Sequence, residues 1–184
     1  MARPSSKKVT KSRGVRARRI TKKRKALFLD RDGVINRSAP KHEYVTRIEE
    51  FEFLPQTFDT LRRLKDAGYD FYVITNQAGV ARGQATHDQM NTLHEYLATE
   101  FEREGLVLHG VYMCPHQDED DCLCRKPKPG LLLQAMQEHE LDPADVVFVG
   151  DRETDMQAAK AAGVRGILIP GEAGISVVLD KLLE

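Results

Sequence analysis

Short apolar runs along the chain alternate with segments in which apolar residues recur every three or four positions. The runs occupy residues 26–29, 71–74, 107–112, 146–149 and 166–169. The segments with this three-to-four-residue, helical spacing are residues 55–67, 86–104, 131–136 and 156–159. Uniformly apolar runs of this length are typical of buried parallel strands, and amphipathic segments between them are typical of covering helices. We therefore predict an α/β fold with a doubly wound, Rossmann-like parallel sheet.

Charge divides the chain into two unequal parts. Residues 1–25 hold twelve Lys or Arg and no acid, which leaves 16 basic against 28 acidic residues, a formal charge of about −12, in residues 26–184. A basic segment poor in large apolar residues is expected to be disordered. We predict a tail over residues 1–25 and one domain over residues 26–184, which at 41% apolar content for the chain is long enough to bury a core.

The tail has several interpretations that its composition leaves open. It is suited to bind RNA, DNA or an acidic partner, and such binding would depend on salt. A solvated extension, a linker left from a fusion and an organelle transit peptide fit the same composition. No secretory or membrane-spanning apolar segment is found, so we expect no membrane partner.

Two carboxylates follow the first apolar run. Asp30 and Asp32 stand two residues apart at its end. One carboxylate can attack phosphorus while the other transfers a proton, and Mg²⁺ would relieve their repulsion. A solvated acidic pair is the alternative interpretation, because such pairs are common in loops.

Three later groups have the chemistry that a phosphoryl group in transit requires. Thr75 follows the second apolar run, Asp151 follows the fourth, and Lys126 follows a cluster of cysteines. A hydroxyl, an ammonium group and a metal-binding acid together stabilise the negative charge that spreads over phosphoryl oxygens. The order of nucleophile, hydroxyl, lysine and acid favours a phosphatase.

In these four motifs the sequence resembles the haloacid dehalogenase superfamily of aspartate-nucleophile phosphatases. The resemblance implies that Asp30 is the nucleophile, that Asp32 is the acid and base, and that Thr75 and Lys126 hold the phosphoryl oxygens. It places Mg²⁺ on the Asp30 carboxylate, the Asp32 backbone carbonyl and Asp151. Short gaps between motifs imply an uncapped site. Asp155 either supports the metal or favours the start of the following helix.

A second cluster predicts a structural metal. Cys114, His116, Cys122 and Cys124 lie within eleven residues and include every cysteine of the chain. Three thiolates and an imidazole can close a tetrahedral Zn²⁺ site with no position for water. One disulfide or three ordinary thiols are the alternatives. Zinc-bound thiolates favour a reducing cytoplasm. The metal-bound loop would also position Arg125 and Lys126, which directly follow it.

The zinc loop followed by Arg125-Lys-Pro resembles the D-glycero-D-manno-heptose-1,7-bisphosphate phosphatases and the related histidinol-phosphatase domain. Five residues between His116 and Cys122 resemble the short histidinol-phosphatase loop, whereas segments such as 80–83 resemble the heptose branch. The first expectation is hydrolysis of the 7-phosphate of the heptose bisphosphate, a phosphoric monoester. Histidinol phosphate is the alternative, and nucleic-acid binding or nucleic-acid end hydrolysis through the tail is a second.

Four further residues are predicted to contact a small phosphorylated metabolite. They are Asn76, Gln77, Arg82 and Arg125. Arg82 is equally compatible with an ordinary exposed loop arginine, and Arg152 is a weaker candidate that would contribute a backbone carbonyl to the magnesium site. We expect the protein to be a monomer.

Overall fold

A computed structural model describes residues 25–40 and 43–184 of the chain. The predicted tail lies outside the described residues, except for Lys25, which begins the first strand. Its predicted disorder and binding therefore stay predictions.

The sheet has the five parallel strands that the apolar runs predict. Its order is β3-β2-β1-β4-β5, and each neighbouring pair is parallel. The strands are β1 (Lys25–Leu29), β2 (Tyr69–Asn76), β3 (Leu108–Cys114), β4 (Val146–Gly150) and β5 (Arg165–Leu168).

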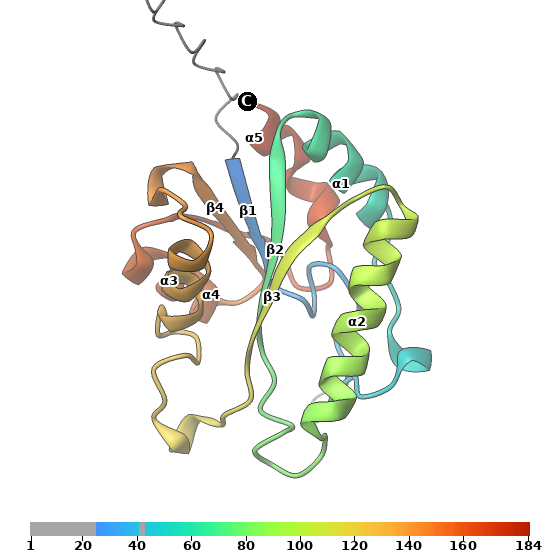
Figure 1. Cartoon of the computed structure of the whole chain (residues 1–184), viewed down its shortest axis with the longest axis vertical. Helices are drawn as coiled ribbons and strands as arrows, with labels where there is room; N and C mark the ends of the chain where they lie inside the picture. Colours follow the sequence, from blue (N-terminus) through green and yellow to red (C-terminus); the bar gives the residue numbers. More distant parts are fainter. Residues whose placement is uncertain (1–24, 41–42) are drawn as a thin grey trace, which may run out of the picture.

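Helices cover both faces of the sheet. In Figure 1, α1, α2 and α5 lie on one side of the strands, and α3 and α4 lie on the other. The α-helices are α1 (Thr57–Asp66), α2 (His87–Arg103), α3 (Gly130–Glu138), α4 (Glu153–Ala162) and α5 (Leu179–Leu183). Short 3₁₀ helices are η1 (Ile48–Glu50), η2 (Asp118–Asp120), η3 (Pro143–Asp145) and η4 (Ile175–Val178).

Alternation along the strands divides the core into two layers. Leu27 and Leu29 pack with α1, α2 and α5, whereas Ala26 and Phe28 pack with α3 and α4. Successive side chains of a strand point to opposite faces, so a strand between two helical layers must be apolar throughout. This is the physical basis of the uninterrupted runs in the sequence.

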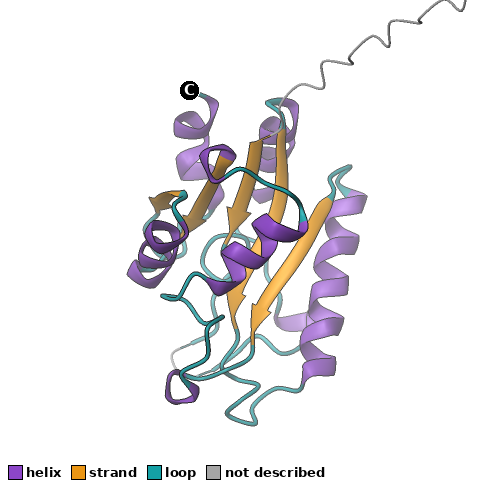
Figure 2. Ribbon diagram, turned by 60° about the vertical axis from the view of Figure 1, so that its left-hand side comes forward, coloured by secondary structure: helices purple, strands orange, loops and turns teal. Residues whose placement is uncertain are grey.

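The parallel arrangement brings the candidate residues to one end of the molecule. Figure 2 shows the strands pointing in one direction, with the loops that follow them gathered beyond their carboxyl ends. Ligands of open α/β sheets bind at this end. Among the described residues, no helix has both the length and the apolar composition needed to cross a bilayer.

Candidate active site

The centre of the site is a buried lysine between two carboxylates. Lys126 Nζ lies 2.9 Å from Asp30 Oδ1 and 2.7 Å from Asp155 Oδ1. It also donates a hydrogen bond to the Ile74 carbonyl oxygen at 3.0 Å. Asp155 is fully buried, and Lys126 is 3% exposed. These contacts use all three protons of the ammonium group and bring β1, β2 and α4 together.

Burial and charge act against each other in this group. Burial raises the pKa of Asp30 to about 7 against the attraction of Lys126, and the Asp155 and Asp32 charges raise it further. Although burial lowers the pKa of Lys126, the Asp30 and Asp155 carboxylates more than offset this, and its pKa is raised. Lys126 is therefore charged, whereas Asp30 needs a further cation to be fully ionised.

Three carboxylates offer a site for that cation. Oxygens of Asp30, Asp151 and Asp155 lie within 4.8 Å of one another. Asp151 Oδ1 is buried and accepts no hydrogen bond from the described residues. At Gly33 a Cβ atom would lie 2.3 Å from Asp151 Oδ2, so glycine permits the close approach of this carboxylate. The charged neighbour of Asp151 Oδ1 is Arg152 Nε at 3.9 Å, and a buried carboxylate oxygen without a hydrogen-bond donor fits a hard divalent cation such as Mg²⁺.

Of the three predicted magnesium ligands, two have side chains in this cluster. Asp30 and Asp151 belong to the carboxylate cluster, and Asp155 joins them. The Asp32 carboxylate is engaged elsewhere, which is compatible with the expectation that this residue offers its backbone carbonyl. Asp155 also accepts a hydrogen bond from the Arg152 backbone N–H at 3.0 Å, so it caps α4 as well.

The Asp32 carboxylate is held on both oxygens. Asn36 Nδ2 donates to Oδ1 at 2.9 Å, and Gln77 Nε2 donates to Oδ2 at 2.8 Å. Arg31 Nη2 lies 3.1 Å from Oδ1 and 3.0 Å from Oδ2. Burial alone would raise the pKa of Asp32, but the Arg31 guanidinium and these hydrogen bonds lower it below its ordinary value.

The residues at the end of β2 mainly hold other site residues. Thr75 is 1% exposed, and its hydroxyl accepts a hydrogen bond from Gln77 Nε2 at 2.9 Å. The Asn76 side chain donates to the Lys126 carbonyl at 3.1 Å and accepts from the Lys126 N–H at 3.2 Å. Asn76 therefore ties β2 to the lysine. Substrate contact by Asn76 and Gln77 stays a prediction.

Sequence reasoning missed Arg31 and His94. Arg31 is fully buried, and its Nη1 lies 3.5 Å from His94 Nε2. Burial lowers the pKa of His94 to about 4, and the Arg31 charge lowers it further, so this ring is neutral. A sequence signal existed for Arg31, because a charged side chain between two acids directly after a buried strand needs a partner.

A cavity of about 320 Å³ opens above the carboxylates. Tyr44, Asp118 and Arg125 belong to its lining together with Asp30 and Asp32. Arg125 Nε lies 2.7 Å from Asp118 Oδ1, and both side chains line the cavity, whereas substrate contact by Arg125 stays a prediction.

Arg82 lies beyond the cavity lining on an exposed loop. Its Nη1 donates a hydrogen bond to the Tyr44 hydroxyl at 3.0 Å. Because Tyr44 lines the cavity, Arg82 reaches the site through this side chain. Direct contact between Arg82 and substrate stays a prediction.

The cysteine cluster is assembled at the end of β3. Cys124 Sγ lies 3.3 Å from both Cys114 Sγ and His116 Nδ1, and Cys122 Sγ lies 3.5 Å from Cys124 Sγ. All three thiols are free. Ligand atoms of tetrahedral Zn²⁺ are about 3.8 Å apart when Zn–S is about 2.3 Å. The four residues could therefore hold zinc after a slight expansion.

The loop that carries the cysteine cluster, residues 114–124, packs on the start of α3. At Gly130 a Cβ atom would lie 2.3 Å from the Leu123 carbonyl oxygen and 3.0 Å from Cys124 Cα. Lys126 follows Cys124 by two residues. Very short chain segments consequently link the fold of this loop to the position of the Lys126 ammonium group.

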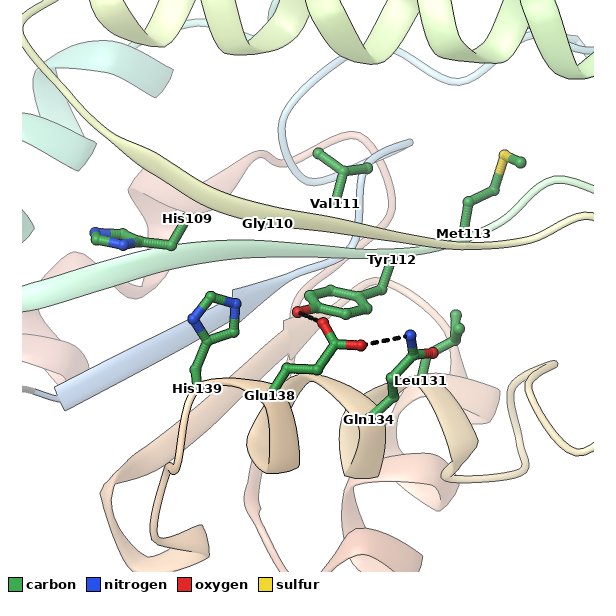
Figure 3. Close-up of a pocket in the computed structure, with 9 residues that line it drawn as sticks. All are labelled: His109, Gly110, Val111, Tyr112, Met113, Leu131, Gln134, Glu138 and His139. Carbon is green, nitrogen blue, oxygen red and sulfur yellow. Dashed lines mark hydrogen bonds between the residues drawn. The ribbon is translucent and has the colours of Figure 1, made fainter.

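A second, larger cavity of about 430 Å³ lies at the outer edge of β3. Figure 3 shows Tyr112 and Gln134 both directed to the Glu138 carboxylate, with His109 and His139 beside them. This cavity is separate from the carboxylate cluster, and its acidic side chain is already engaged by two donors.

Comparison with known proteins agrees with this geometry. Residues 123–175 match the family model described as HAD-hydrolase-like. The D-glycero-beta-D-manno-heptose-1,7-bisphosphate 7-phosphatase of Pasteurella multocida (strain Pm70) is 41% identical over 152 residues, 79% of this chain and 81% of the relative. The Helicobacter pylori (strain J99) enzyme of the same name is 44% identical over 146 residues, 79% and 82% of the two chains.

A solved structure supports the same relationship. The D,D-heptose 1,7-bisphosphate phosphatase from B. bronchiseptica, complexed with magnesium and phosphate, superposes with a TM-score of 0.74 at 34% identity. The match covers 85% of this chain and 86% of that chain. This chain belongs to the D-glycero-beta-D-manno-heptose-1,7-bisphosphate 7-phosphatase family of haloacid dehalogenase-like hydrolases.

Proposed function

We propose that the protein is a magnesium-dependent phosphatase that hydrolyses the 7-phosphate of D-glycero-D-manno-heptose 1,7-bisphosphate. The observation that carries this proposal is the buried Asp30–Lys126–Asp155 group beside Asp151, in a chain 37 to 44% identical to enzymes of that name. Mg²⁺ would be held by Asp30, Asp151, Asp155 and the Asp32 carbonyl. When bound, it would withdraw charge from the phosphoryl oxygens.

In the first step Asp30 attacks phosphorus. The Arg31 N–H and Lys126 Nζ both contact Asp30 Oδ1, which leaves Oδ2 to form the new P–O bond. The bond from phosphorus to the sugar oxygen breaks, and Asp32 gives its proton to that oxygen. The negative phosphate raises the pKa of Asp32 from its lowered value, so that the residue can bring a proton to this step.

In the second step the aspartyl-phosphate is hydrolysed. Asp32, now a carboxylate, takes a proton from water, and the water oxygen attacks phosphorus. The bond between phosphorus and Asp30 breaks, which restores the nucleophile and releases phosphate. Lys126 balances the charge of Asp30 throughout.

Phosphate release with Mg²⁺ tests the substrate. We expect kcat/KM to be much larger for the heptose bisphosphate than for histidinol phosphate, with Asp30→Asn as the inactive blank. Histidinol phosphate is retained as a competitor because only five residues separate His116 from Cys122. A preference for histidinol phosphate would overturn the proposed substrate, and full activity of Asp30→Asn would overturn the mechanism.

We also propose structural Zn²⁺ on Cys114, His116, Cys122 and Cys124. Close packing of three free thiols around an imidazole nitrogen supports it. Thiolates bound in this way suit a reducing compartment, so we propose the cytoplasm as the location.

A second proposed activity, nucleic-acid binding, belongs to the basic tail. Twelve Lys or Arg with no acid in residues 1–25 support it. Deleting residues 1–24 should abolish retention on a nucleic-acid column. At physiological salt, the deletion should leave kcat/KM unchanged for a phosphate monoester whose alcohol carries no charge. If the full chain is not retained at low salt, this activity is absent.

A further inference from the structure

Arg31 is a charged side chain with no exposed surface. Its relative exposure is 0%, although it stands between the two carboxylates of the site. Removing a guanidinium from water costs several kcal/mol unless its partners compensate. A fully buried arginine beside a catalytic acid is therefore expected to have a defined set of contacts, and each of them can be traced.

One side of the guanidinium faces Asp32. Arg31 Nε lies 3.3 Å from Asp32 Oδ1, and Nη2 lies 3.0 Å from Asp32 Oδ2. A fork of two donors against two carboxylate oxygens fixes both the distance and the rotation of the carboxylate, which a single ammonium group cannot do. Asn36 and Gln77 complete the arrangement with one hydrogen bond to each oxygen.

The other side of the guanidinium faces the helical layer. Arg31 Nη1 lies 3.5 Å from Nε2 of His94 on α2, and the guanidinium carbon lies 5.8 Å from the centre of the Phe51 ring. The neutral ring of His94 can accept a hydrogen bond from the Arg31 Nη1–H group, and the aromatic face of Phe51 attracts the cation. His94 and Phe51 thereby hold the guanidinium on one side, while its other side holds Asp32.

Arg31 has no access to substrate. The cavity is lined by Asp30 and Asp32, and Arg31 does not belong to its lining. Its backbone is fixed as well, because the Arg31 carbonyl accepts hydrogen bonds from the Ile35 and Asn36 N–H groups at 2.9 and 3.2 Å. Any contribution of this side chain to turnover must pass through Asp32.

We propose that Arg31 is a positioning residue for proton transfer: its fork holds the Asp32 carboxylate in the orientation from which it serves the leaving oxygen. His94 on α2 supports the fork from behind. This inference rests on the proposed function, since it assumes that Asp32 is the acid of the first step.

Leaving groups of different basicity test the proposal. A sugar alkoxide needs a proton as it departs, whereas p-nitrophenolate is stable as an anion and departs without one. General acid catalysis contributes about 10²–10⁴-fold where it is needed. Because kcat/KM covers only the steps through aspartyl-phosphate formation, it isolates this contribution from the hydrolysis step.

We expect Arg31→Leu to lower kcat/KM for the heptose bisphosphate at least tenfold more than kcat/KM for p-nitrophenyl phosphate. Arg31→Lys keeps the charge without the fork and should restore only part of the difference. Arg103→Leu, at an exposed position on α2, is the matched control and should change neither value. Equal losses on both esters with Arg31→Leu would show a purely structural role and overturn the proposal.

His94→Leu keeps the inference testable if Arg31→Leu does not fold. It removes the acceptor behind the guanidinium and leaves the Arg31–Asp32 pair in place, so we expect a smaller loss with the same selectivity for the alkyl ester. If His94→Leu folds and loses no more activity on the heptose bisphosphate than on p-nitrophenyl phosphate, that result contradicts the proposal. A wild type that hydrolyses β-glycerol phosphate but not the heptose ester would overturn the proposed substrate alone, and the comparison of esters would then use β-glycerol phosphate.

Discussion

At the scale of single residues, the site is organised by the shortage of positive charge. Asp30 and Asp155 both contact the Lys126 ammonium group, and an oxygen of Asp151 lies within 4.8 Å of oxygens of both. Like charges in a buried site raise one another's pKa unless a cation intervenes. We therefore expect the carboxylates to depend on Lys126 and on the proposed Mg²⁺ in different ways, and each dependence has a measurable consequence.

Lys126→Met should destabilise the protein as well as inactivate it. Removing one partner from a buried ion pair costs about 3–5 kcal/mol, because it leaves the remaining charge uncompensated. We expect a lower Tm in EDTA, partly restored by millimolar Mg²⁺, with phosphatase activity lost. The exposed Lys160→Met on α4 is the control. An unchanged Tm in EDTA would contradict the proposed electrostatic role.

Asp30 should make the metal-free protein less stable as pH rises. Because burial raises its pKa to about 7, the folded state holds a proton between about pH 4 and pH 7 that the unfolded chain has released. The free energy of unfolding contributed by this group is thus lost as pH rises through that window. In EDTA, denaturant titrations from pH 5 to pH 8 should show a larger decrease for wild type than for Asp30→Asn. Equal decreases would contradict the raised pKa.

At the scale of elements, the sequence pattern and the structure agree where burial alone decides. All five strands overlap the predicted apolar runs, and α2 begins where Thr86 and Gln89 form reciprocal capping hydrogen bonds. The order of strands and the fork of Arg31 on Asp32 depend on contacts between distant segments. Periodicity carries no information about such contacts. It also misplaced one strand boundary, because Val107, the first residue of the run that predicts β3, is 59% exposed and lies outside that strand.

The candidate site shows the same limit. The motif residues were predicted because Asp30, Thr75 and Asp151 have characteristic chemistry at the ends of apolar runs, and because Lys126 follows the cysteine cluster. What sequence could not supply is which oxygen or nitrogen each side chain engages, as when Asn76 turned out to hold the backbone of Lys126. The split between two interpretations of Asp155 had the same cause, since its contacts serve both the lysine and the start of α4.

The zinc loop gives the prediction that belongs to this scale. Cys122→Ser should lower bound zinc below one equivalent and reduce kcat, because the loop that leads to Arg125 and Lys126 loses a ligand. Elemental analysis of the purified protein measures the first effect, and phosphate release the second. Leu123→Ser alters an exposed neighbour between two ligands and should change neither. Full zinc content in Cys122→Ser would refute the site.

At the scale of the whole molecule, the net charge of residues 25–184 is negative and repels an anionic substrate. A chain that lacks residues 1–24 has 17 basic and 28 acidic residues, a formal charge of −11. Repulsion between such a body and a bisphosphate slows association and is screened by salt within about 10 Å at 0.1 M. The basic tail brings the formal charge of the full chain to zero.

Ionic strength should therefore affect the two forms differently. We expect kcat/KM of the chain lacking residues 1–24 to rise as NaCl increases from 10 to 150 mM, and that of the full chain to rise less. Initial rates with the heptose bisphosphate at low substrate measure both values. Parallel salt curves would mean that the tail does not alter the field at the site.

The sheet order also has a consequence for how the enzyme is made. β1, which Asp30 directly follows, lies between β2 and β4, although it is the first of these five strands in the sequence. Its second neighbour begins at Val146, and the last carboxylate of the cluster is Asp155. A nascent or truncated chain that ends before these residues has an incomplete sheet and lacks part of the proposed Mg²⁺ site. Interrupted translation would then release inert fragments, and phosphatase activity would arise only when synthesis is nearly finished.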